Sequence, residues 1–343
     1  MVKKLIVILV LIGIIGISLY IYVDSQNLRN EVFESNYNLK VLKKGPIEEL
    51  KEESVFNGKD RLNVLLIGRD TSGVRRSNGQ GGFNTDVMIL ISADIVSNRI
   101  LFTSVPRDLW INGNKINALN ILYGEDTLVD AFEKITGQVV DGVISIDFDG
   151  FIWLVDAFGG VPIEVQRSFS DYTFPVFDDS GITTISFTEG IETMDGMRAL
   201  TFARSRKGTN GEGSDLMRAK RQHLILQGMA NALEQPESIF SLDNIPGFYD
   251  LLTQHMETTL TLGDTYYLWD FYKDRNIYSA ESFVIGDEYI YHPGMYPESS
   301  YTAWVFVPRD GDFSRIHSDI DAKLNGTFVT EVDPPVAGIK SDL

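Results

Sequence analysis

The chain has 343 residues, carries a formal net charge of −18 and contains no cysteine. Thiol catalysis and disulfide bonds are therefore excluded, so the folded part must depend on a hydrophobic core. The acidic balance argues against nucleic acid as a partner, because general affinity for nucleic acid needs a broad basic surface.

The N-terminus predicts a membrane anchor. Lys3 and Lys4 precede residues 5–23, an unbroken apolar segment that is long enough to cross a hydrocarbon layer of about 30 Å as a helix. No small-residue cleavage site follows it, so we expect a retained anchor rather than a cleaved signal peptide. The lysine pair predicts that residues 1–4 are cytoplasmic. We therefore expect a single-pass protein of the cell membrane, with its C-terminal domain extracellular.

After the anchor, residues 24–60 are polar and charged, which predicts a stalk or linker. From residue 61 onward, short apolar runs alternate with helix-like segments. Strands are predicted at residues 62–67, 87–93, 100–105, 142–146 and 161–165, and helices at residues 128–135, 148–157 and 215–234. The alternation predicts an α/β fold, a layered α-β-α domain with a central mixed sheet, preceded by one transmembrane helix.

These patterns place the main domain at residues 61–233, with residues 166–192 as an excursion from the sheet. Residues 234–330 are less periodic and rich in aromatic side chains, and they predict a C-terminal accessory region packed on the core. Residues 331–343 include Pro334 and Pro335 and predict a disordered tail.

A cluster of arginines stands out in this acidic chain. Arg204 and Arg206 are two residues apart, so an extended backbone sends both side chains to one side. Arg218, Arg221 and Gln222 are spaced to share one face of a helix. Because guanidinium groups match phosphate oxygens as rigid forks of donors, the cluster predicts a phosphorylated ligand. An ordinary solvated helix face is the alternative.

Two aspartates at predicted strand ends, Asp70 and Asp86, are candidates for an acidic half of the same site. Open α/β sheets bind ligands at strand ends. Two carboxylates there suit Mg²⁺ when a substrate phosphate supplies further oxygens. Capping or turn formation is the alternative for either aspartate alone. Arg107 and Asp108 follow the third predicted strand, where Pro106 fixes the turn that aims Arg107.

Arg75 and Arg76 lie in a glycine-rich loop at residues 72–82. They are placed to reach a phosphate, with a mobile loop as the alternative. The loop lacks the glycine, lysine and serine or threonine spacing of a nucleotide P-loop.

The order and spacing of several short motifs resemble the LytR-CpsA-Psr family, transferases that attach glycopolymers to the cell wall. The resemblance covers residues 61–233. The matching stretches are residues 63–70 (NVLLIGRD), 85–90 (TDVMIL), 104–108 (SVPRD), 115–118 (KINA), 155–161 (VDAFGGV), 196–200 (GMRAL), 204–206 (RSR) and 215–222 (DLMRAKRQ). Each motif is weak alone, and the combination is specific.

The resemblance implies a polyprenyl-pyrophosphate-linked glycan as donor, peptidoglycan as acceptor and Mg²⁺ held by Asp70 and Asp86. It also implies that the pyrophosphate is bound by Arg107, Arg204, Arg206, Arg218 and Gln222. The helical spacing of the arginine cluster adds Arg221 to these candidates.

Two details of the site stay open. Asp108 or a metal-linked carboxylate such as Asp86 is the candidate general base for the acceptor hydroxyl. Asn84 stands where the family usually has arginine, and Arg75 or Arg76 is the candidate replacement.

The sequence hypothesis is thus a membrane-anchored extracellular phosphotransferase that cleaves a pyrophosphate with the help of Mg²⁺. Two alternatives remain: a polyprenyl-pyrophosphate glycan hydrolase, and a non-catalytic receptor or regulator that binds anionic glycopolymers. The family implies an apolar groove for the lipid. Met194, Met197, Phe202 and Met229 are candidates for its lining, although such spacing is more typical of core residues.

Overall fold

The computed structural model describes residues 51–79, 84–157, 159–177, 181–233, 256–261, 263–264, 267–268, 278–295, 297 and 304–328. The predicted anchor, most of the predicted stalk and the predicted tail lie outside these ranges. Across the ranges that are described, no helix combines the length and the apolar character that crossing a membrane requires.

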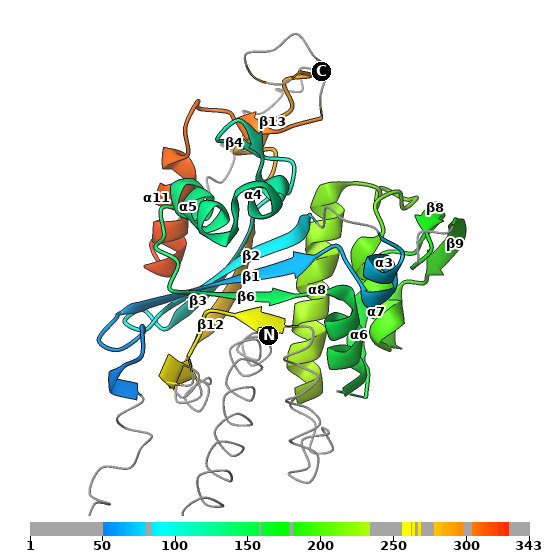
Figure 1. Ribbon diagram of the computed structural model, residues 1–343, viewed down its shortest axis with the longest axis horizontal. Helices are drawn as coiled ribbons and strands as arrows, with labels where there is room; N and C mark the ends of the chain where they lie inside the picture. Colours follow the sequence, from blue (N-terminus) through cyan, green and yellow to red (C-terminus); the bar gives the residue numbers. More distant parts are fainter. Residues whose placement is uncertain are drawn as a thin grey trace, which may run out of the picture.

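A six-stranded mixed sheet forms the centre of the molecule (Figure 1). Its order is β11 (Met256–Thr258), β6 (Gly142–Ile146), β1 (Arg61–Arg69), β2 (Thr85–Asp94), β3 (Arg99–Ser104) and β12 (Ser279–Val284). The pairs β1–β6 and β3–β12 are parallel, whereas β1–β2, β2–β3 and β6–β11 are antiparallel. The prediction of an α/β fold around a mixed sheet is confirmed.

Both faces of the sheet are buried, which explains the nearly continuous apolar runs of its central strands. Leu65 and Ile67 of β1 point into one core cluster, and Val64 points into another that contains Phe56 and Leu268. The first cluster is covered by α4 (Ile116–Tyr123), α5 (Glu125–Thr136) and α11 (Ser314–Leu324), which lie together on one face of the sheet (Figure 1).

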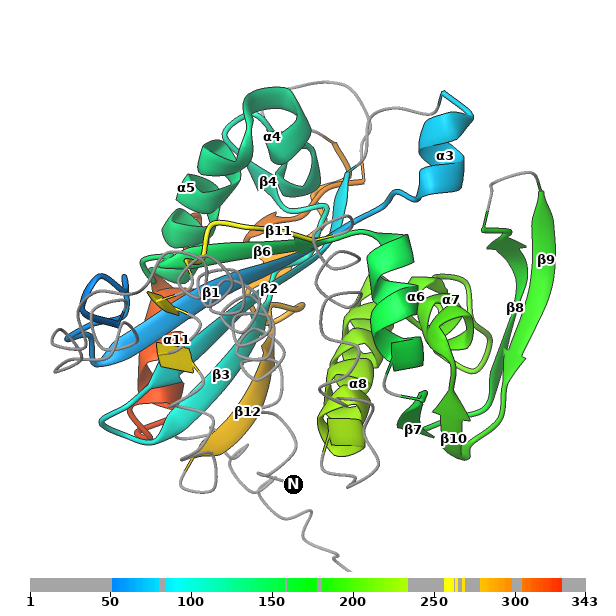
Figure 2. The same ribbon diagram turned by 60° about the horizontal axis from the view of Figure 1, so that its bottom comes forward.

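The remaining long helices lie beyond the strand ends of the sheet, next to part of its second face (Figure 2). They are α6 (Phe148–Ala157), α7 (Gly196–Arg204) and α8 (Asp215–Leu233). With them pack the strand pairs β7 (Val161–Val165) with β10 (Gly190–Met194) and β8 (Phe169–Pro175) with β9 (Ile182–Phe187). This lateral unit, residues 148–233, has its own core cluster. The predicted helices at 148–157 and 215–234 are confirmed, and α8 contacts the second face of the sheet through Leu226 and His223.

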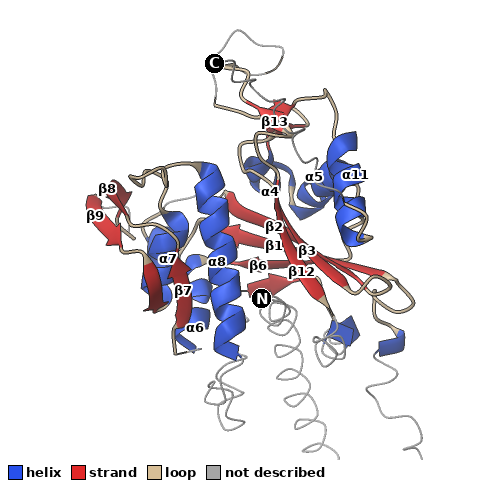
Figure 3. Ribbon diagram, turned by 180° about the vertical axis from the view of Figure 1, so that it is seen from behind, coloured by secondary structure: helices blue, strands red, loops and turns tan. Residues whose placement is uncertain are grey.

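The C-terminal third contributes to the central sheet. Strands β11 and β12 are the two edge strands, and β12 lies beside β3 (Figure 3). The predicted boundary after residue 233 therefore cuts through the sheet, and residues 256–324 do more than pack on a finished core. The short elements are α3 (Gly73–Ser77), β4 (Trp110–Ile111), β5 (Asn114–Lys115), β13 (Ile290–Tyr291) and β14 (Val307–Pro308).

The strand directions bring charged residues to one edge of the sheet, by which we mean the side formed by strand ends and not an edge strand. Strands β1, β3 and β6 end at this edge, and the antiparallel β2 begins there. Asp70, Arg107 and Asp147 follow the three strand ends, and Asp86 lies at the start of β2. The lateral unit packs next to this edge, so the fold encloses a space between the two.

Candidate active site

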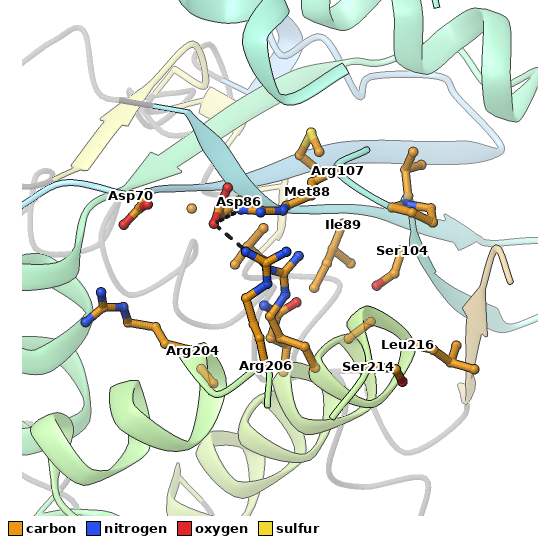
Figure 4. A pocket seen from close by; sticks show the side chains of 18 of the residues that line it. Asp70, Asp86, Met88, Ile89, Ser104, Arg107, Arg204, Arg206, Ser214 and Leu216 are labelled. Atoms are coloured by element: carbon orange, nitrogen blue, oxygen red, sulfur yellow. Dashed lines mark hydrogen bonds and ion pairs between the residues drawn. The ribbon is translucent and has the colours of Figure 1, made fainter. Parts of the chain in front are cut away.

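A cavity of about 1240 Å³ occupies this space. Its sheet side is formed by the ends of β1, β2, β3 and β6, and its helical side by α7, α8 and the end of β8. A third wall comes from the chain after β12, within residues 285–292 and 304–309. Figure 4 shows Asp70, Asp86 and Arg107 on the sheet side, opposite Arg204 and Arg206 on the helical side. We call this space the main cavity.

Asp86 is the carboxylate at the centre of the cationic part. Its Oδ2 accepts a hydrogen bond from Nη1 of Arg107 at 2.5 Å and lies 3.9 Å from Nη1 of Arg218. Its Oδ1 is buried and accepts no hydrogen bond from the residues that the structure describes. One carboxylate oxygen is therefore paired with arginine, and the other is left for a ligand.

Asp70 borders the main cavity together with Asp86 and is held in place by hydrogen bonds. Its Oδ1 accepts a hydrogen bond from Nη1 of Arg75 at 2.6 Å, and its backbone N–H donates to the carbonyl oxygen of Asn84 at 2.9 Å. Arg75 borders the main cavity, whereas Arg76 does not. Of the two candidate replacements for the arginine that is absent at Asn84, the structure therefore brings Arg75 to the site.

The helical side contributes the predicted cationic ligands. Arg204, Arg206, Arg218 and Gln222 all border the main cavity. The guanidinium carbon of Arg204 lies 4.6 Å from the centre of the Phe148 ring. A guanidinium over an aromatic face is attracted by the ring quadrupole, so the ring holds Arg204 in place without consuming its hydrogen-bond donors.

The loop that carries Arg206 is held by Asp171 of β8. Oδ2 of Asp171 accepts hydrogen bonds from the hydroxyl of Ser205 at 2.9 Å and from the backbone N–H of Lys207 at 3.1 Å. Burial by itself raises the pKa of Asp171, but these donors, together with the backbone of Thr173 and Arg206, lower it overall. Asp171 therefore stays ionised and fixes the loop on the wall of the main cavity.

The prediction that Arg221 binds pyrophosphate is wrong. Arg221 does not border the main cavity, and its side chain is almost fully buried. Its guanidinium donates to Oε2 of Glu212 at 2.7 Å, to the carbonyl oxygen of Phe202 at 3.1 Å and to that of Ser205 at 2.5 Å. All of these partners belong to α7 or to the loop that follows it, so Arg221 holds the loop instead of a ligand.

Asp108 and Arg76 also lie elsewhere than predicted. Asp108 is buried outside the main cavity and accepts a hydrogen bond from Nζ of Lys115 at 2.6 Å. Its Oδ2 lies 3.6 Å from Nε of Arg107, so it orients that arginine and cannot act as the general base for a ligand in the cavity. Arg76 pairs with Asp147 at 2.9 Å.

A large part of the main cavity is apolar. It is lined by aliphatic side chains from the sheet, from α7 and α8 and from the segment around β13, among them Leu66, Met88, Ile89, Leu200, Leu216, Ile225, Leu226 and Ile290. The predicted candidates for a lipid groove are not among the lining residues. Met194, Phe202 and Met229 are buried in the core of the lateral unit, and Met197 is exposed. For three of these four residues, the alternative of a plain core position is correct.

The comparisons with known proteins agree with this arrangement. A sequence model of the LytR_cpsA_psr family matches residues 22–301. The chain belongs to this family. The polyisoprenyl-teichoic acid–peptidoglycan teichoic acid transferase TagU of Oceanobacillus iheyensis is 25% identical over 290 residues, which cover 81% of each chain. TagT of Bacillus subtilis, a transferase of the same description, is 28% identical over 247 residues, covering 70% of this chain and 72% of TagT.

The crystal structure of B. subtilis TagV has the same fold. It superimposes with a TM-score of 0.56 and 23% sequence identity, covering 78% of this chain and 98% of TagV.

The residues of this LytR_cpsA_psr protein suit a hard divalent cation only in part. Within the described ranges, no three histidine or carboxylate side chains gather as a metal-binding group. Asp70 and Asp86 border the same cavity, and Oδ1 of Asp86 is buried without a hydrogen-bond donor. Hard carboxylate oxygens of this kind fit Mg²⁺ when phosphate oxygens and water complete the coordination shell.

Several residues that line the main cavity were not predicted as site residues. Arg69 is the last residue of β1, and Asp147 follows β6. The position of Asp147 directly after a predicted strand was a usable signal. Phe148, which lies against Arg204, carries no motif of its own.

Proposed function

We propose that this protein is a membrane-anchored extracellular transferase that moves a phosphoglycan from a polyprenyl-pyrophosphate carrier to peptidoglycan. The observation that carries the proposal is the division of one cavity into a cationic part and an apolar part. A polyprenyl pyrophosphate has the same division, a charged diphosphate followed by a hydrocarbon chain. The names of the relatives support both the polyisoprenyl donor and the peptidoglycan acceptor.

In the proposed complex, the diphosphate lies between the sheet side and the helical side of the main cavity. Arg107 and Arg218 approach it next to Asp86. Arg204 at the end of α7 and Arg206 in the loop that follows approach it from the helical side. Several guanidinium groups around one diphosphate neutralise the charge that spreads over its oxygens in the transition state. The prenyl chain takes the apolar part of the cavity.

The reaction replaces the anhydride bond of the glycan-bearing phosphorus with an ester bond to the acceptor. The oxygen of an acceptor sugar hydroxyl attacks that phosphorus, and the bond from phosphorus to the bridging oxygen breaks. The products are a phosphodiester and polyprenyl monophosphate, whose new charge stays within reach of the arginines. With Asp108 excluded, Asp86 is our candidate for accepting the hydroxyl proton, because it is the carboxylate beside Arg107 and Arg218.

We further propose that Asp70 and Asp86 hold Mg²⁺ together with the diphosphate. A bound divalent cation would polarise the phosphoryl oxygens and offset their charge. The chain's own contribution is to bring both carboxylates to one edge of the sheet. Oδ2 of Asp86 is paired with arginine, whereas Oδ1 is left to bind the cation.

The test is a transfer assay with the full-length protein in detergent, a lipid-linked phosphoglycan and peptidoglycan. Arg107→Ala and Arg204→Ala should each reduce transfer by at least about a hundredfold, the size of effect seen when a preorganised transition-state donor is removed. Arg198→Ala is the matched control. Arg198 belongs to the same stretch of sequence but pairs with Glu192 and does not border the main cavity, so it should remain active.

The products of the same assay separate the proposal from its two alternatives. A transferase leaves the phosphoglycan on peptidoglycan, whereas a hydrolase releases it free in solution. Binding without turnover, unchanged when Mg²⁺ is withdrawn, would instead identify a receptor. Full activity of both arginine variants would contradict the assignment of the site.

A further inference from the structure

One wall of the main cavity carries aromatic rings that the proposed binding of the diphosphate and the prenyl chain does not use. Tyr291, His292, Trp304 and Phe306 all border the cavity, and we call them the aromatic rim. Trp304 is 59% exposed and Tyr291 is 41% exposed, although both are large and partly apolar. The rings of His292 and Trp304 lie 4.2 Å apart between centroids, and those of Trp304 and Phe306 lie 6.1 Å apart.

The rim is arranged before any ligand binds. Nδ1 of His292 lies 2.8 Å from the carbonyl oxygen of Val305. A carbonyl oxygen only accepts hydrogen bonds, so Nδ1 is the donor, and in the neutral ring Nε2 is left as an acceptor. The contact also fixes the orientation of the imidazole against Trp304.

The rim is joined directly to the segment that carries Arg107. The backbone N–H of Phe306 donates to the carbonyl oxygen of Asp108 at 3.0 Å, and the N–H of Trp110 donates to the carbonyl oxygen of Phe306 at 2.8 Å. A molecule that rests on the rim is therefore held at a fixed position relative to the arginine that we place on the diphosphate.

The chemistry of the rim suits a sugar ring better than a hydrocarbon chain. A pyranose has an apolar face of C–H groups, which packs on an aromatic face, and a polar circumference of hydroxyl and amide groups. Asp287 and Arg309 border the cavity next to the rim, and Nε of Arg309 donates to the carbonyl oxygen of Asp287 at 2.5 Å. A few polar groups beside aromatic ones are what an oriented ligand with a mixed surface needs.

The place of the rim in the molecule favours the acceptor over the donor. The first described residues, 51–57, and β13, which leads into the rim, lie at opposite ends of the molecule in Figures 1 and 3. In the proposed function the chain arrives from the membrane at its N-terminal end, so the rim faces away from the membrane. We infer that the aromatic rim is a subsite for the acceptor, a glycan strand of peptidoglycan; this inference rests on the proposed function.

The first test measures binding without turnover. The full-length protein in detergent is titrated with soluble, uncross-linked peptidoglycan glycan strands in the absence of any donor, and binding is followed by calorimetry. Trp304→Ala should weaken binding roughly tenfold, in line with the loss of one central aromatic contact. Trp304→Phe should recover most of the affinity, because it keeps an aromatic face.

Tyr172→Ala is the matched control, because Tyr172 is an aromatic residue that is 64% exposed but does not border the main cavity. It should bind like the unaltered protein, and all variants should keep the same melting temperature. Equal binding by Trp304→Ala and the unaltered protein would overturn the inference.

The second test uses the transfer assay. Trp304→Ala should raise KM for the glycan strand roughly tenfold and leave KM for the lipid-linked donor unchanged. A change confined to the donor KM would assign the rim to the donor glycan and overturn the inference. Glycan binding that depends on Trp304 in a protein that transfers nothing would retain the subsite and reject the proposed function.

Discussion

Arg75 and Arg76 are neighbours in the sequence, yet their guanidinium groups lie in different surroundings. Arg75 borders the main cavity and pairs with Asp70, and its guanidinium lies 5.8 Å from the Phe148 ring. Arg76 pairs with Asp147, which borders the main cavity, but Arg76 itself does not border it. One helical position, about 100° of rotation around the axis of α3, separates the two environments.

This difference makes a sharp prediction. Arg75→Ala should raise KM for the lipid-linked donor, because it removes a cation that borders the main cavity beside Asp70. Arg76→Ala should leave that KM within about twofold, since Arg76 does not border the main cavity. Steady-state kinetics of the two variants provide the measurement, and equal effects would refute our choice of Arg75.

A second prediction concerns the contribution of the buried Arg221 to stability. Arg221 and Glu212 form an ion pair whose side chains are 2% and 6% exposed. Glu212→Gln leaves the guanidinium buried without its carboxylate, which typically costs about 3–5 kcal/mol. Urea unfolding should therefore show a large loss of stability.

The control for Glu212→Gln is Glu192→Gln. Glu192 pairs with Arg198, and the two side chains are 32% and 33% exposed. An ion pair of that kind contributes at most about 1 kcal/mol. Similar losses in the two variants would show that Arg221 does not hold the loop as we describe.

At the scale of elements, α8 is joined to the sheet by a polar contact within a mostly apolar interface. Nε2 of His223 on α8 lies 2.6 Å from the hydroxyl of Ser104 on β3, and both residues are buried. Burial disfavours the charged imidazole and lowers the pKa of His223 to about 4. The interface between α8 and the sheet therefore requires a neutral histidine.

Stability should consequently fall as the pH drops. Above the unfolded pKa of about 6.5, His223 is neutral in both states and costs nothing. Between pH 6.5 and about 4 the unfolded chain binds a proton that the folded protein refuses, so stability decreases, by about 2 kcal/mol at pH 5. His223→Gln cannot titrate and should lack this part of the decrease. Urea unfolding at pH 7.5 and pH 5 measures it, and parallel curves for both proteins would exclude it.

How far the sequence predicts the elements depends on where they are buried. The strands at 62–67 and 87–93 were predictable because both of their faces are covered, which leaves an apolar run in the sequence. Strand β12, with the sequence SAESFV, is an edge strand whose side chains are mostly exposed, and it leaves no such run. Helical spacing likewise places Arg218 and Arg221 on one face of α8, but it cannot show that only Arg218 of the two borders the cavity.

The motifs of the site were predictable for a related reason. Asp70, Asp86 and Arg107 follow or begin strands, so their meeting at one edge follows from the strand directions. The aromatic rim comes from a segment with no recognisable motif, and its relation to Arg107 depends on backbone hydrogen bonds between residues far apart in the chain. Only the tertiary structure shows it.

At the scale of the whole molecule, the last described helix completes a core that begins at β1. Ile316, Ile320 and Leu324 of α11 are buried in the cluster that contains Leu65. Nη1 of Arg61 also donates to Oδ1 of Asp321 at 2.7 Å. The central sheet is thus stabilised by both ends of the described chain.

Removal of residues 314–343 should therefore abolish cooperative folding, although every predicted site residue remains. Three buried aliphatic side chains contribute about 5–9 kcal/mol, which is comparable with the whole stability of a domain. Removal of residues 329–343 alone, most of which we predict to be a disordered tail, should have no effect. Limited proteolysis and near-ultraviolet circular dichroism compare the two truncations, and a folded shorter protein would contradict the role of α11.

In the proposed function, the late position in the chain of β12 and of residues 285–292 and 304–309 also sets the order in which the main cavity is assembled during export. A polypeptide that is threaded outward from an N-terminal anchor delivers its arginines and aspartates long before the third wall of the main cavity. A half-exported chain then has the charges of the site but no compartment to enclose a prenyl tail. In the proposed function, a lipid-linked donor would therefore be enclosed only after residues 304–309 have joined the main cavity.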